Sequence, residues 1–381
     1  MKVLRWDLPA WGFFVSSSVA FALIATIPLM GMVQIPRTPF FIAMICGVFG
    51  MVVLAYLTKV LTGTEVYIFH HYFVTVVSMA AAALWLIGEP VLRNLDVVII
   101  AVGVTYACGR VACLRGGCCY GRPFVWGFCY PAEYLDHGFP PGLIGVKLFP
   151  SQLLESLWMW ATTAIACALL LRGAQPGSAF AWFVVLYSVG RFFSDFYRLK
   201  AGVCVRGLSE AQIASIVMTC VVFGGEQVAL LPAQPIHGVM ALLLLIVGIP
   251  RLLNKSDHEL LFKTDHVIEI ANAVKSANNN RIACSRQTSG FEPATMSVER
   301  TSLGLLISAG TISTKDGLLI HYCFSREATL RDSTAQALAR LISLIDGRSG
   351  KGSFIKGSGA FHVVLGGSEH RKFWNATSAR R

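Results

Sequence analysis

The chain has 381 residues, of which 55% are hydrophobic and only 14% are charged, and its formal net charge is +11. The mean hydropathy is +0.61. A soluble domain carries about 25% charged residues, so this composition excludes an ordinary soluble protein for most of the chain. Positive charge beside long apolar runs suits anionic lipid headgroups better than nucleic acid. We therefore expect a membrane partner and no nucleic acid.

Eight apolar runs follow one another through the first two thirds of the chain. They cover residues 11–33, 39–58, 66–88, 95–112, 151–171, 178–197, 211–231 and 237–253. Each is long enough to cross a hydrocarbon core of about 30 Å as a helix, although the last is marginal. The first run has a basic start, as a signal peptide would, but it is longer than the usual apolar region and lacks a clear cleavage site. We expect it to be retained, which predicts an all-α polytopic membrane protein with seven to eight transmembrane helices over residues 1–254.

The composition changes near residue 254. The segment TLRDSTAQALARLISLIDG has the spacing of an amphipathic helix, and GLLISAGTIS and GLLIHYCFS have strand-like patterns. The polar segment SANNNRIACSRQTSG, residues 276–290, indicates a loop. We therefore predict that residues 255–381 form a small α+β C-terminal domain outside the membrane. Its sequence carries no nucleotide-binding motif, and it does not indicate a function.

Cations gather at the end of the fourth apolar run. The stretch GRVACLRGGCCYGRP, residues 109–123, holds Arg110, Arg115 and Arg122 among several glycines. Arginine presents a rigid fork of donors that matches phosphate, and glycine lets the backbone approach a ligand closely. A second interpretation is that these arginines only reach from a helix end toward lipid headgroups.

A second group of ionisable residues lies in YSVGRFFSDFYR, residues 187–198, at the end of the sixth run. Arg191 and Asp195 are four residues apart, so they can pair on one face of a helix. Tyr187 and Arg198 lie near the same face. An ion pair at membrane depth can be purely structural, but such groups are functional candidates by default.

Two further polar groups lie at the starts of apolar runs. FPSQLLES places Gln152 and Glu155 in the first turns of the fifth helix, and VYIFHHYF places His70 near the start of the third. Because successive spans alternate in direction, all four groups lie toward the same side of the membrane. Cations, carboxylates, histidine and amide together predict a polar cavity that binds an anionic lipid.

The order of these motifs resembles that of the prolipoprotein diacylglyceryl transferase family of bacterial integral membrane enzymes. GRVACLRGGCCYGR matches the glycine and arginine positions of G-R-x-G-N-F-x-N-G-E-x-x-G-R, and FPSQLLE resembles H-P-S-Q-L-Y-E. YSVGRFFSDFYR resembles Y-G-x-x-R-F-x-x-E-x-x-R, and GLSEAQIAS resembles the segment G-L-S-x-x-Q. The four motifs occur in the family's order and cover roughly residues 60–230.

This resemblance implies an activity. The family transfers the diacylglyceryl group of phosphatidylglycerol to the lipobox cysteine thiol of a preprolipoprotein signal peptide and releases glycerol phosphate. It implies a multi-pass protein of the bacterial inner membrane, and it requires no cofactor and no metal, because the arginines supply the positive charge.

The resemblance also implies roles for individual residues. Arg110 would hold the donor phosphate, and Arg191 would assist it. His70 falls at the family's H-G-G histidine and is the candidate base or proton shuttle. Further substrate-binding candidates are Tyr187, Asp195, Gln152, Glu155, Arg122 and Arg198.

The chain departs from the family pattern at several polar positions. Cys113 stands for the asparagine of the first motif and Cys118 for its acidic residue, while Phe149 replaces the histidine of the second motif. The glycines after the H-G-G histidine are His71 and Tyr72. The arginines are therefore kept better than the groups that would position an acceptor. A membrane protein of the same fold that moves another group, or that binds anionic phospholipid without turnover, stays open as an alternative.

The cysteines allow a different interpretation, in which Cys113, Cys118, Cys119 and Cys129 form a metal or redox site. No C-x-x-C pair and no zinc-module spacing of Cys and His occurs among the 11 cysteines. A spacing of five does not place Cys113 and Cys118 on one helix face, and neighbouring side chains point apart in regular structure. We therefore expect these thiols to pack rather than to bind a ligand.

The charges of the loops disagree with the family's topology. With eight spans, the side that carries the site also carries most of the loop lysines and arginines: Lys2, Arg5, Lys59, Lys147, Lys200 and Arg206. The positive-inside rule would place that side in the cytoplasm. The resemblance implies the outer side of the inner membrane, where translocated signal peptides arrive. We follow the resemblance, because lipid-binding cations raise the count around such a site.

Overall fold

A computed structural model of the chain describes residues 10–62, 69–199, 204–205, 207–253, 261–287, 297–314, 317–327, 330–347, 353–357 and 359–366. The chain forms two compact units, and the first combines Met1–Cys119 with Ser151–Lys255. The second combines Tyr120–Pro150 with Ser256–Arg381. The loop between the fourth and fifth apolar runs is therefore grouped with the C-terminal residues, which the composition of the chain did not indicate.

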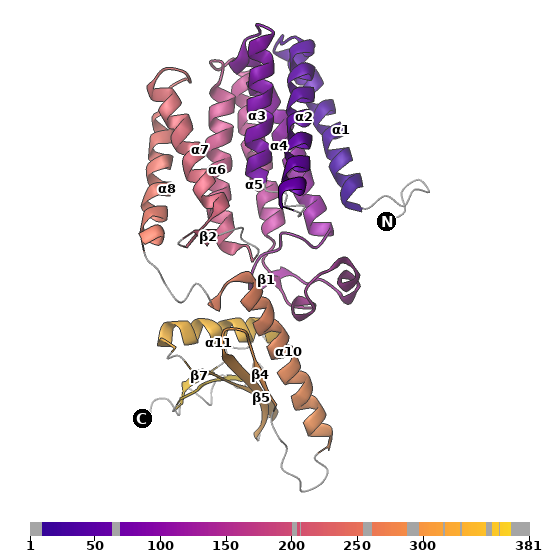
Figure 1. The fold of residues 1–381 in the computed structure, drawn as a ribbon, viewed down its shortest axis with the longest axis vertical. Helices are drawn as coiled ribbons and strands as arrows, with labels where there is room; N and C mark the ends of the chain where they lie inside the picture. The colour runs from indigo at the N-terminus through magenta and orange to yellow at the C-terminus, as the bar shows by residue number, and fades with distance from the viewer. Residues whose placement is uncertain are drawn as a thin grey trace, which may run out of the picture. The chain divides into compact units, whose positions relative to one another are not determined.

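The first unit is a bundle of long helices that run side by side (Figure 1). These are α1 Ala10–Met32, α2 Arg37–Thr62, α3 Phe69–Leu86, α4 Val91–Arg115, α5 Ser151–Leu171, α6 Ser178–Ser194, α7 Glu210–Gln227 and α8 Pro235–Leu253. The 3-10 turn η3, Asp195–Tyr197, extends α6, and the short strands β2 Cys204–Val205 and β3 Leu208–Ser209 pair just before α7. Each of the eight predicted apolar runs is thus a helix.

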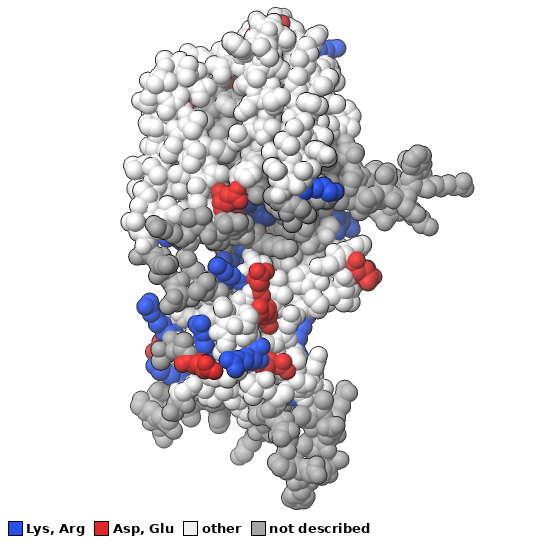
Figure 2. Space-filling view, viewed as in Figure 1, with Lys and Arg blue, Asp and Glu red and all other residues white. Residues whose placement is uncertain are grey.

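Five of these helices are long and apolar enough to cross a membrane: α2, α4, α5, α6 and α8. In the described residues, α1 and α3 contain shorter apolar helices. Figure 2 shows few Lys, Arg, Asp or Glu side chains on the visible face of the bundle. The prediction of a helical membrane protein is confirmed at this level.

Helix α4 lies at the centre of the bundle. The run Val97–Ala101 is buried completely or nearly so and packs with residues of α1 and α2 on one side and of α5 and α6 on the other. Its Asp96 carboxylate accepts hydrogen bonds from the backbone N–H groups of Gly177 and Phe180, each at 2.7 Å. These donors belong to the first turn of α6, which has no acceptors of its own for them. Asp96 therefore fixes the start of α6 against α4.

Gly190 lets α5 and α6 approach closely. A Cβ atom at this position would lie 2.0 Å from Nε1 of Trp158 on α5. That indole nitrogen donates to the Leu186 carbonyl at 2.8 Å, so the ring fills the space that the glycine leaves. The contact lies one turn from Glu155 and next to Arg191, and it sets the spacing at which the two side chains meet.

In its described residues, the second unit contains a mixed loop region, a sheet and two helices. The loop region holds β1 Pro123–Phe128, η1 Ala132–His137 and η2 Pro141–Leu143. The strands are β4 Val298–Arg300, β5 Leu305–Thr314, β6 Gly317–Arg326, β7 Ser353–Lys356 and β8 Phe361–Leu365, and the helices are α10 Thr264–Gln287 and α11 Asp332–Asp346. The sheet is antiparallel with the order β4-β5-β6-β8-β7, and β5 pairs with β6 from Leu305↔Arg326 to Thr314↔Gly317. The predicted strands and the predicted amphipathic helix are confirmed.

The loop predicted over residues 276–290 is wrong for the part that the structure describes, because α10 continues to Gln287. Its apolar positions Val267, Ile270, Val274 and Ala277 are buried at helical spacing, and the helix packs against β4 and β5. Asn280 donates to the Glu299 carboxylate at 3.1 Å. Tertiary packing therefore holds a polar segment of low helix propensity in a helix. Residues 288–290 lie outside the described residues.

We predict that Gly190→Ala destabilises the bundle, because the added methyl group overlaps Trp158 and forces α5 and α6 apart. Overpacking of this kind costs about 1–3 kcal/mol. The free energy of unfolding in detergent micelles measures the effect. Gly224→Ala on α7 is the matched control, since no atom lies within 4 Å of its added Cβ. Equal stabilities of the two variants would contradict the close contact.

Candidate functional site

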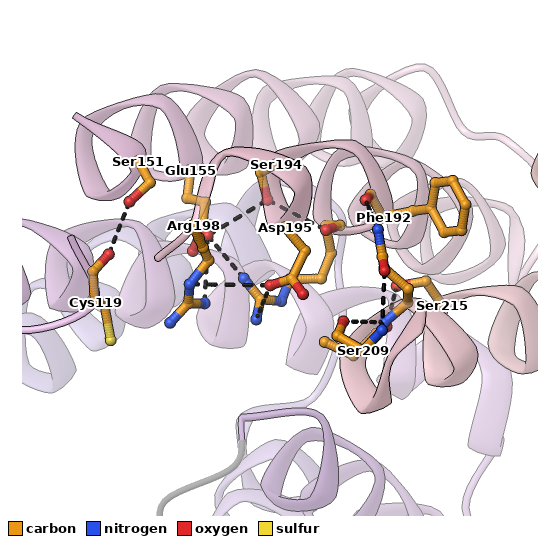
Figure 3. Close-up of polar contacts among 12 residues, drawn as sticks. Cys119, Ser151, Glu155, Phe192, Ser194, Asp195, Arg198, Ser209 and Ser215 are labelled. Atoms are coloured by element: carbon orange, nitrogen blue, oxygen red, sulfur yellow. Dashed lines mark hydrogen bonds and ion pairs between the residues drawn. The ribbon is translucent and has the colours of Figure 1, made fainter. Parts of the chain in front are cut away.

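A buried cluster of charges joins α4, α5 and α6, and Glu155 is its centre. Nε of Arg110 lies 2.7 Å from Glu155 Oε2, and a guanidinium nitrogen of Arg191 lies 2.7 Å from Oε1. Arg198 approaches Oε1 at 3.5 Å. One carboxylate thus bridges three arginines that come from two different stretches of the sequence. Figure 3 shows Glu155 beside Arg198 and Asp195.

Asp195 completes this group, which we call the arginine cluster: Arg110, Glu155, Arg191, Asp195 and Arg198. Arg191 and Asp195 are 3.0 Å apart, so the predicted pair at positions i and i+4 is confirmed. Three guanidinium groups and two carboxylates leave a formal excess of one positive charge. Glu155 and Asp195 are about 5% exposed or less. Because buried charge must be balanced, this excess favours an anion beside the cluster.

Two residues that the sequence analysis missed hydrogen-bond to this cluster. Tyr106 donates to Glu155 Oε2 at 3.1 Å and accepts from the Arg110 guanidinium. Ser194 lies 3.4 Å from Glu155 Oε1. Tyr106 stands four residues before Arg110 on α4, and this helical spacing was the available signal.

A cavity of about 210 Å³ opens beside the arginine cluster. Glu155, Arg191 and Tyr187 contribute to its lining, together with the apolar side chains of Trp158, Met159 and Phe193. The lining is therefore mostly apolar, and Glu155 and Arg191 are its charged members. Such a lining suits an amphiphilic ligand, with an anionic group toward the arginines and hydrocarbon against the apolar walls.

The loop after α4 is fixed to the start of α5 by two hydrogen bonds. Ser151 Oγ donates to the Cys119 carbonyl at 2.7 Å (Figure 3), and Gln152 Nε2 donates to the Cys118 carbonyl at 2.6 Å. Both donors belong to the FPSQLLE motif, so this motif holds the cysteine loop in place. Gln152 was predicted to line the cavity, but the structure shows it bonded to the loop backbone.

The prediction that the cysteines of this loop point apart is wrong. The Sγ atoms of Cys113, Cys118 and Cys119, which we call the thiol cluster, all lie within 4.8 Å of one another. The helix ends at Arg115 and the chain reverses at Gly117, whose φ is +65°. Cys119 itself has a φ of +57°. The rule that neighbouring side chains point apart holds only for regular backbone, and this segment is not regular.

The thiol cluster lies near the arginines. Hydrogen bonds from the thiols of Cys113 and Cys118 lower the pKa of Cys119 well below its usual value, although burial opposes this shift. The positive charges of Arg198 and Arg110 lower the pKa of Cys119 further. Hydrogen bonds with the thiols of Cys113 and Cys119 raise the pKa of Cys118, and burial adds to this shift. The two adjacent cysteines of this loop therefore have pKa shifts of opposite direction.

His70 lies in a second polar group, between α3 and α7. Glu210 Oε1, in the first residue of α7, is 3.4 Å from Nε2 of His70 and 2.7 Å from Nε2 of His71. His70 is buried and His71 is half exposed. A carboxylate beside an imidazole orients the ring and fixes which of its nitrogens carries the proton. Glu210 falls in the GLSEAQIAS motif, at a position that the family pattern leaves variable, so no signal marked it.

The structure brings together five of the predicted residues in the arginine cluster and its neighbourhood: Arg110, Glu155, Arg191, Asp195 and Arg198. Tyr187 packs against Tyr106, with ring centroids 6.0 Å apart.

Gln212 of the GLSEAQIAS motif forms a capping box with Ser209, and its Nε2 donates to the Phe192 carbonyl at 3.1 Å. This motif therefore starts α7 and ties it to α6. Arg122 belongs to the second unit, and its role remains a prediction.

Fold and site together define a helical membrane protein with a buried, positively charged site beside an apolar cavity. Residues 40–225 match the family model described as prolipoprotein diacylglyceryl transferase. The resemblance that the motifs indicated is confirmed over this range.

Individual relatives carry the same name. The chain is 30% identical over 128 residues to a phosphatidylglycerol–prolipoprotein diacylglyceryl transferase of Clostridium perfringens. This alignment covers 33% of this chain and 48% of the relative. It is 28% identical over 126 residues to that of Clostridium tetani, and 27% identical over 128 residues to that of Dehalococcoides mccartyi. These alignments cover 33% and 32% of this chain and 49% and 46% of the relatives. The chain thus spans about half the length of the relatives it matches, and no solved structure matches it.

We predict that Glu155→Gln strongly destabilises the first unit. The change leaves three buried guanidinium groups without their shared carboxylate, and breaking a buried pair on one side costs about 3–5 kcal/mol. Unfolding in detergent measures this loss. Asp332→Asn is the control, because its ion pair with Lys356 at 2.8 Å is exposed and is worth about 1 kcal/mol or less. Similar losses for both variants would show that Glu155 does not hold the cluster together.

Proposed function

We propose that this protein transfers the diacylglyceryl group of phosphatidylglycerol to the lipobox cysteine thiol of preprolipoproteins. The observation that carries this proposal is the buried arginine cluster, with its excess of positive charge, beside a mostly apolar cavity. The similarity of residues 40–225 to a family of that name supports it.

The donor lipid supplies the anion that the arginine cluster favours. Arg110 and Arg191 present guanidinium groups that are already oriented by Glu155, and a phosphodiester can accept from their remaining N–H donors. Because Glu155 holds the side chains in place before the lipid arrives, little ordering is needed on binding. Tyr187 and Trp158 line the part of the cavity where acyl chains fit.

The reaction needs a thiolate and a stabilised leaving group. The acceptor thiol gives up its proton, and its sulfur attacks the glyceryl carbon that bears the phosphate ester oxygen. A C–S bond forms, the C–O bond breaks, and glycerol phosphate leaves with the electron pair. The arginines balance the charge on the leaving phosphate. His70, oriented by Glu210, is the candidate to accept the thiol proton.

We place the protein in the bacterial inner membrane as a multi-pass protein. The eight helices of the first unit would supply seven to eight spans, of which five have the length and composition of transmembrane helices in the described residues. Its partners would be phosphatidylglycerol and the signal peptides of preprolipoproteins.

A second candidate function is the binding of anionic phospholipid without turnover. It is favoured by the cysteines at positions 113 and 118, where the family pattern has an asparagine and an acidic residue. These substitutions leave the arginine cluster complete and change the groups beside it. Lipid binding without transfer to any acceptor peptide would identify this function.

The proposal predicts that Arg110→Ala abolishes transfer while the protein still inserts in the membrane. Lysine at this position keeps the charge but loses the planar fork that pairs with Glu155 and phosphate, so Arg110→Lys should restore little activity. Transfer of radiolabelled lipid from phosphatidylglycerol to a lipobox peptide measures the effect in purified protein. Loss of one charge-assisted contact in the transition state costs roughly 100-fold or more in rate.

Arg172→Ala serves as the control, since Arg172 is exposed at the far end of α5 from Glu155. This variant should keep its activity. If the Arg110→Ala protein is as active as the control, Arg110 has no part in the reaction.

A further inference from the structure

The geometry of the thiol cluster points to a metal site: we propose that Cys113, Cys118 and Cys119 bind Zn²⁺ through three thiolates, with a fourth coordination position open. Zinc bound to sulfur at about 2.3 Å in a tetrahedron holds its sulfur ligands about 3.8 Å apart. The three Sγ atoms already lie within 4.8 Å of one another. Small side-chain rotations therefore suffice to enclose one ion.

The backbone is shaped to bring these sulfurs together. Cys118 returns to the end of α4, where its N–H donates to the Cys113 carbonyl at 3.2 Å. Cys119 adopts a left-handed backbone conformation with a φ of +57°, which is unfavourable for a residue other than glycine or asparagine. This conformation turns the side chains of two adjacent cysteines toward the same point. The backbone carbonyls of Cys118 and Cys119 accept from Gln152 and Ser151, so the strained turn is held from α5.

The surroundings suit a soft cation with thiolate ligands. Thiolates select ions such as Zn²⁺ over hard cations, and three ligands with one free position are typical of catalytic zinc. All three cysteines are free and partly exposed, so an ion and a further ligand can reach them.

The occupant of the open position follows from the proposed function and depends on it. The acceptor of the reaction is a thiol, and a thiol that binds zinc is deprotonated outright. Zinc held by this loop would then deprotonate the acceptor thiol beside the phosphate-binding arginines. Cys113 and Cys118, which stand where the family pattern has an asparagine and an acidic residue, would then serve as zinc ligands.

The experiment measures metal in the purified full-length protein. The protein is purified in the presence of a thiol reductant, stripped with a chelator, dialysed against Zn²⁺ alone and analysed for bound metal. We expect one zinc per chain in the wild type and about tenfold less bound zinc, or a larger loss, in the triple variant Cys113→Ser, Cys118→Ser, Cys119→Ser. The matched control carries serine at positions 46, 167 and 220, three free cysteines of α2, α5 and α7, and should keep its zinc.

Replacing Zn²⁺ with Co²⁺ allows the metal–sulfur bonds to be detected by absorption spectroscopy, and a change in folding alone does not produce this signal. Co²⁺ in the site should show sulfur-to-metal charge-transfer absorption, which Cys113→Ser alone should reduce by about a third, because one of three thiolates is lost. A lipobox peptide should shift the cobalt bands, whereas its cysteine-to-serine counterpart should not. A shift without lipid transfer would support the metal site and contradict the proposed function.

Three results would overturn the site. The first is a wild type that binds no zinc after reconstitution. The second is a disulfide between two of these cysteines in protein purified with reductant. The third is zinc retained by the triple serine variant but lost on His71→Gln, which would assign the metal to the group of His70, His71 and Glu210.

Discussion

Three arginines share one buried carboxylate, and the rest of the first unit is arranged around the need to keep them together. A guanidinium group in an apolar bundle is costly unless its charge and its donors are matched. Glu155 contacts Arg110, Arg191 and Arg198, while Asp195 contacts Arg191. The partners come from α4, α5 and the end of α6, so these three helices have to meet at one point. Because the carboxylates do not cancel the positive charge completely, a formal charge of +1 remains on this group.

Packing elsewhere in the bundle holds α4, α5 and α6 in the positions at which these charged side chains meet. Asp96 fixes the start of α6 against α4, and Gly190 lets α6 approach α5 one turn from Glu155. The FPSQLLE motif contributes Glu155 to the cluster and also uses Ser151 and Gln152 to hold the loop after α4. Motifs that are far apart in the sequence therefore contact one another around Glu155 in the folded bundle. The same constraint gives the cysteine loop a fixed position near the arginines.

The helices and the main ion pair could be predicted from the sequence because both depend on local spacing. All eight apolar runs form helices, and Arg191 pairs with Asp195 as their spacing of four indicated. The central role of Glu155 could not be predicted, since its partners are 36 to 49 residues distant and only packing brings them together. The thiol cluster depends on a positive φ at Cys119, a residue type that gives no signal for such a backbone. The end of α10 was missed because contacts with the sheet outweigh the low helix propensity of its asparagines.

The second unit is discontinuous in sequence, and this affects how the protein is made and how it can be divided. Residues 120–150 leave the first unit after Cys119 and return at Ser151, and their partners begin only at residue 256. During synthesis the inserted segment emerges long before α10, whose Lys275 donates to the carbonyls of Pro141 and Ile144. The inserted segment therefore lacks its partner until α5, α6, α7 and α8 have been synthesised and α10 has followed them. A truncation after the last apolar helix would leave the insertion permanently without that support, so the two units cannot be separated by a single cut.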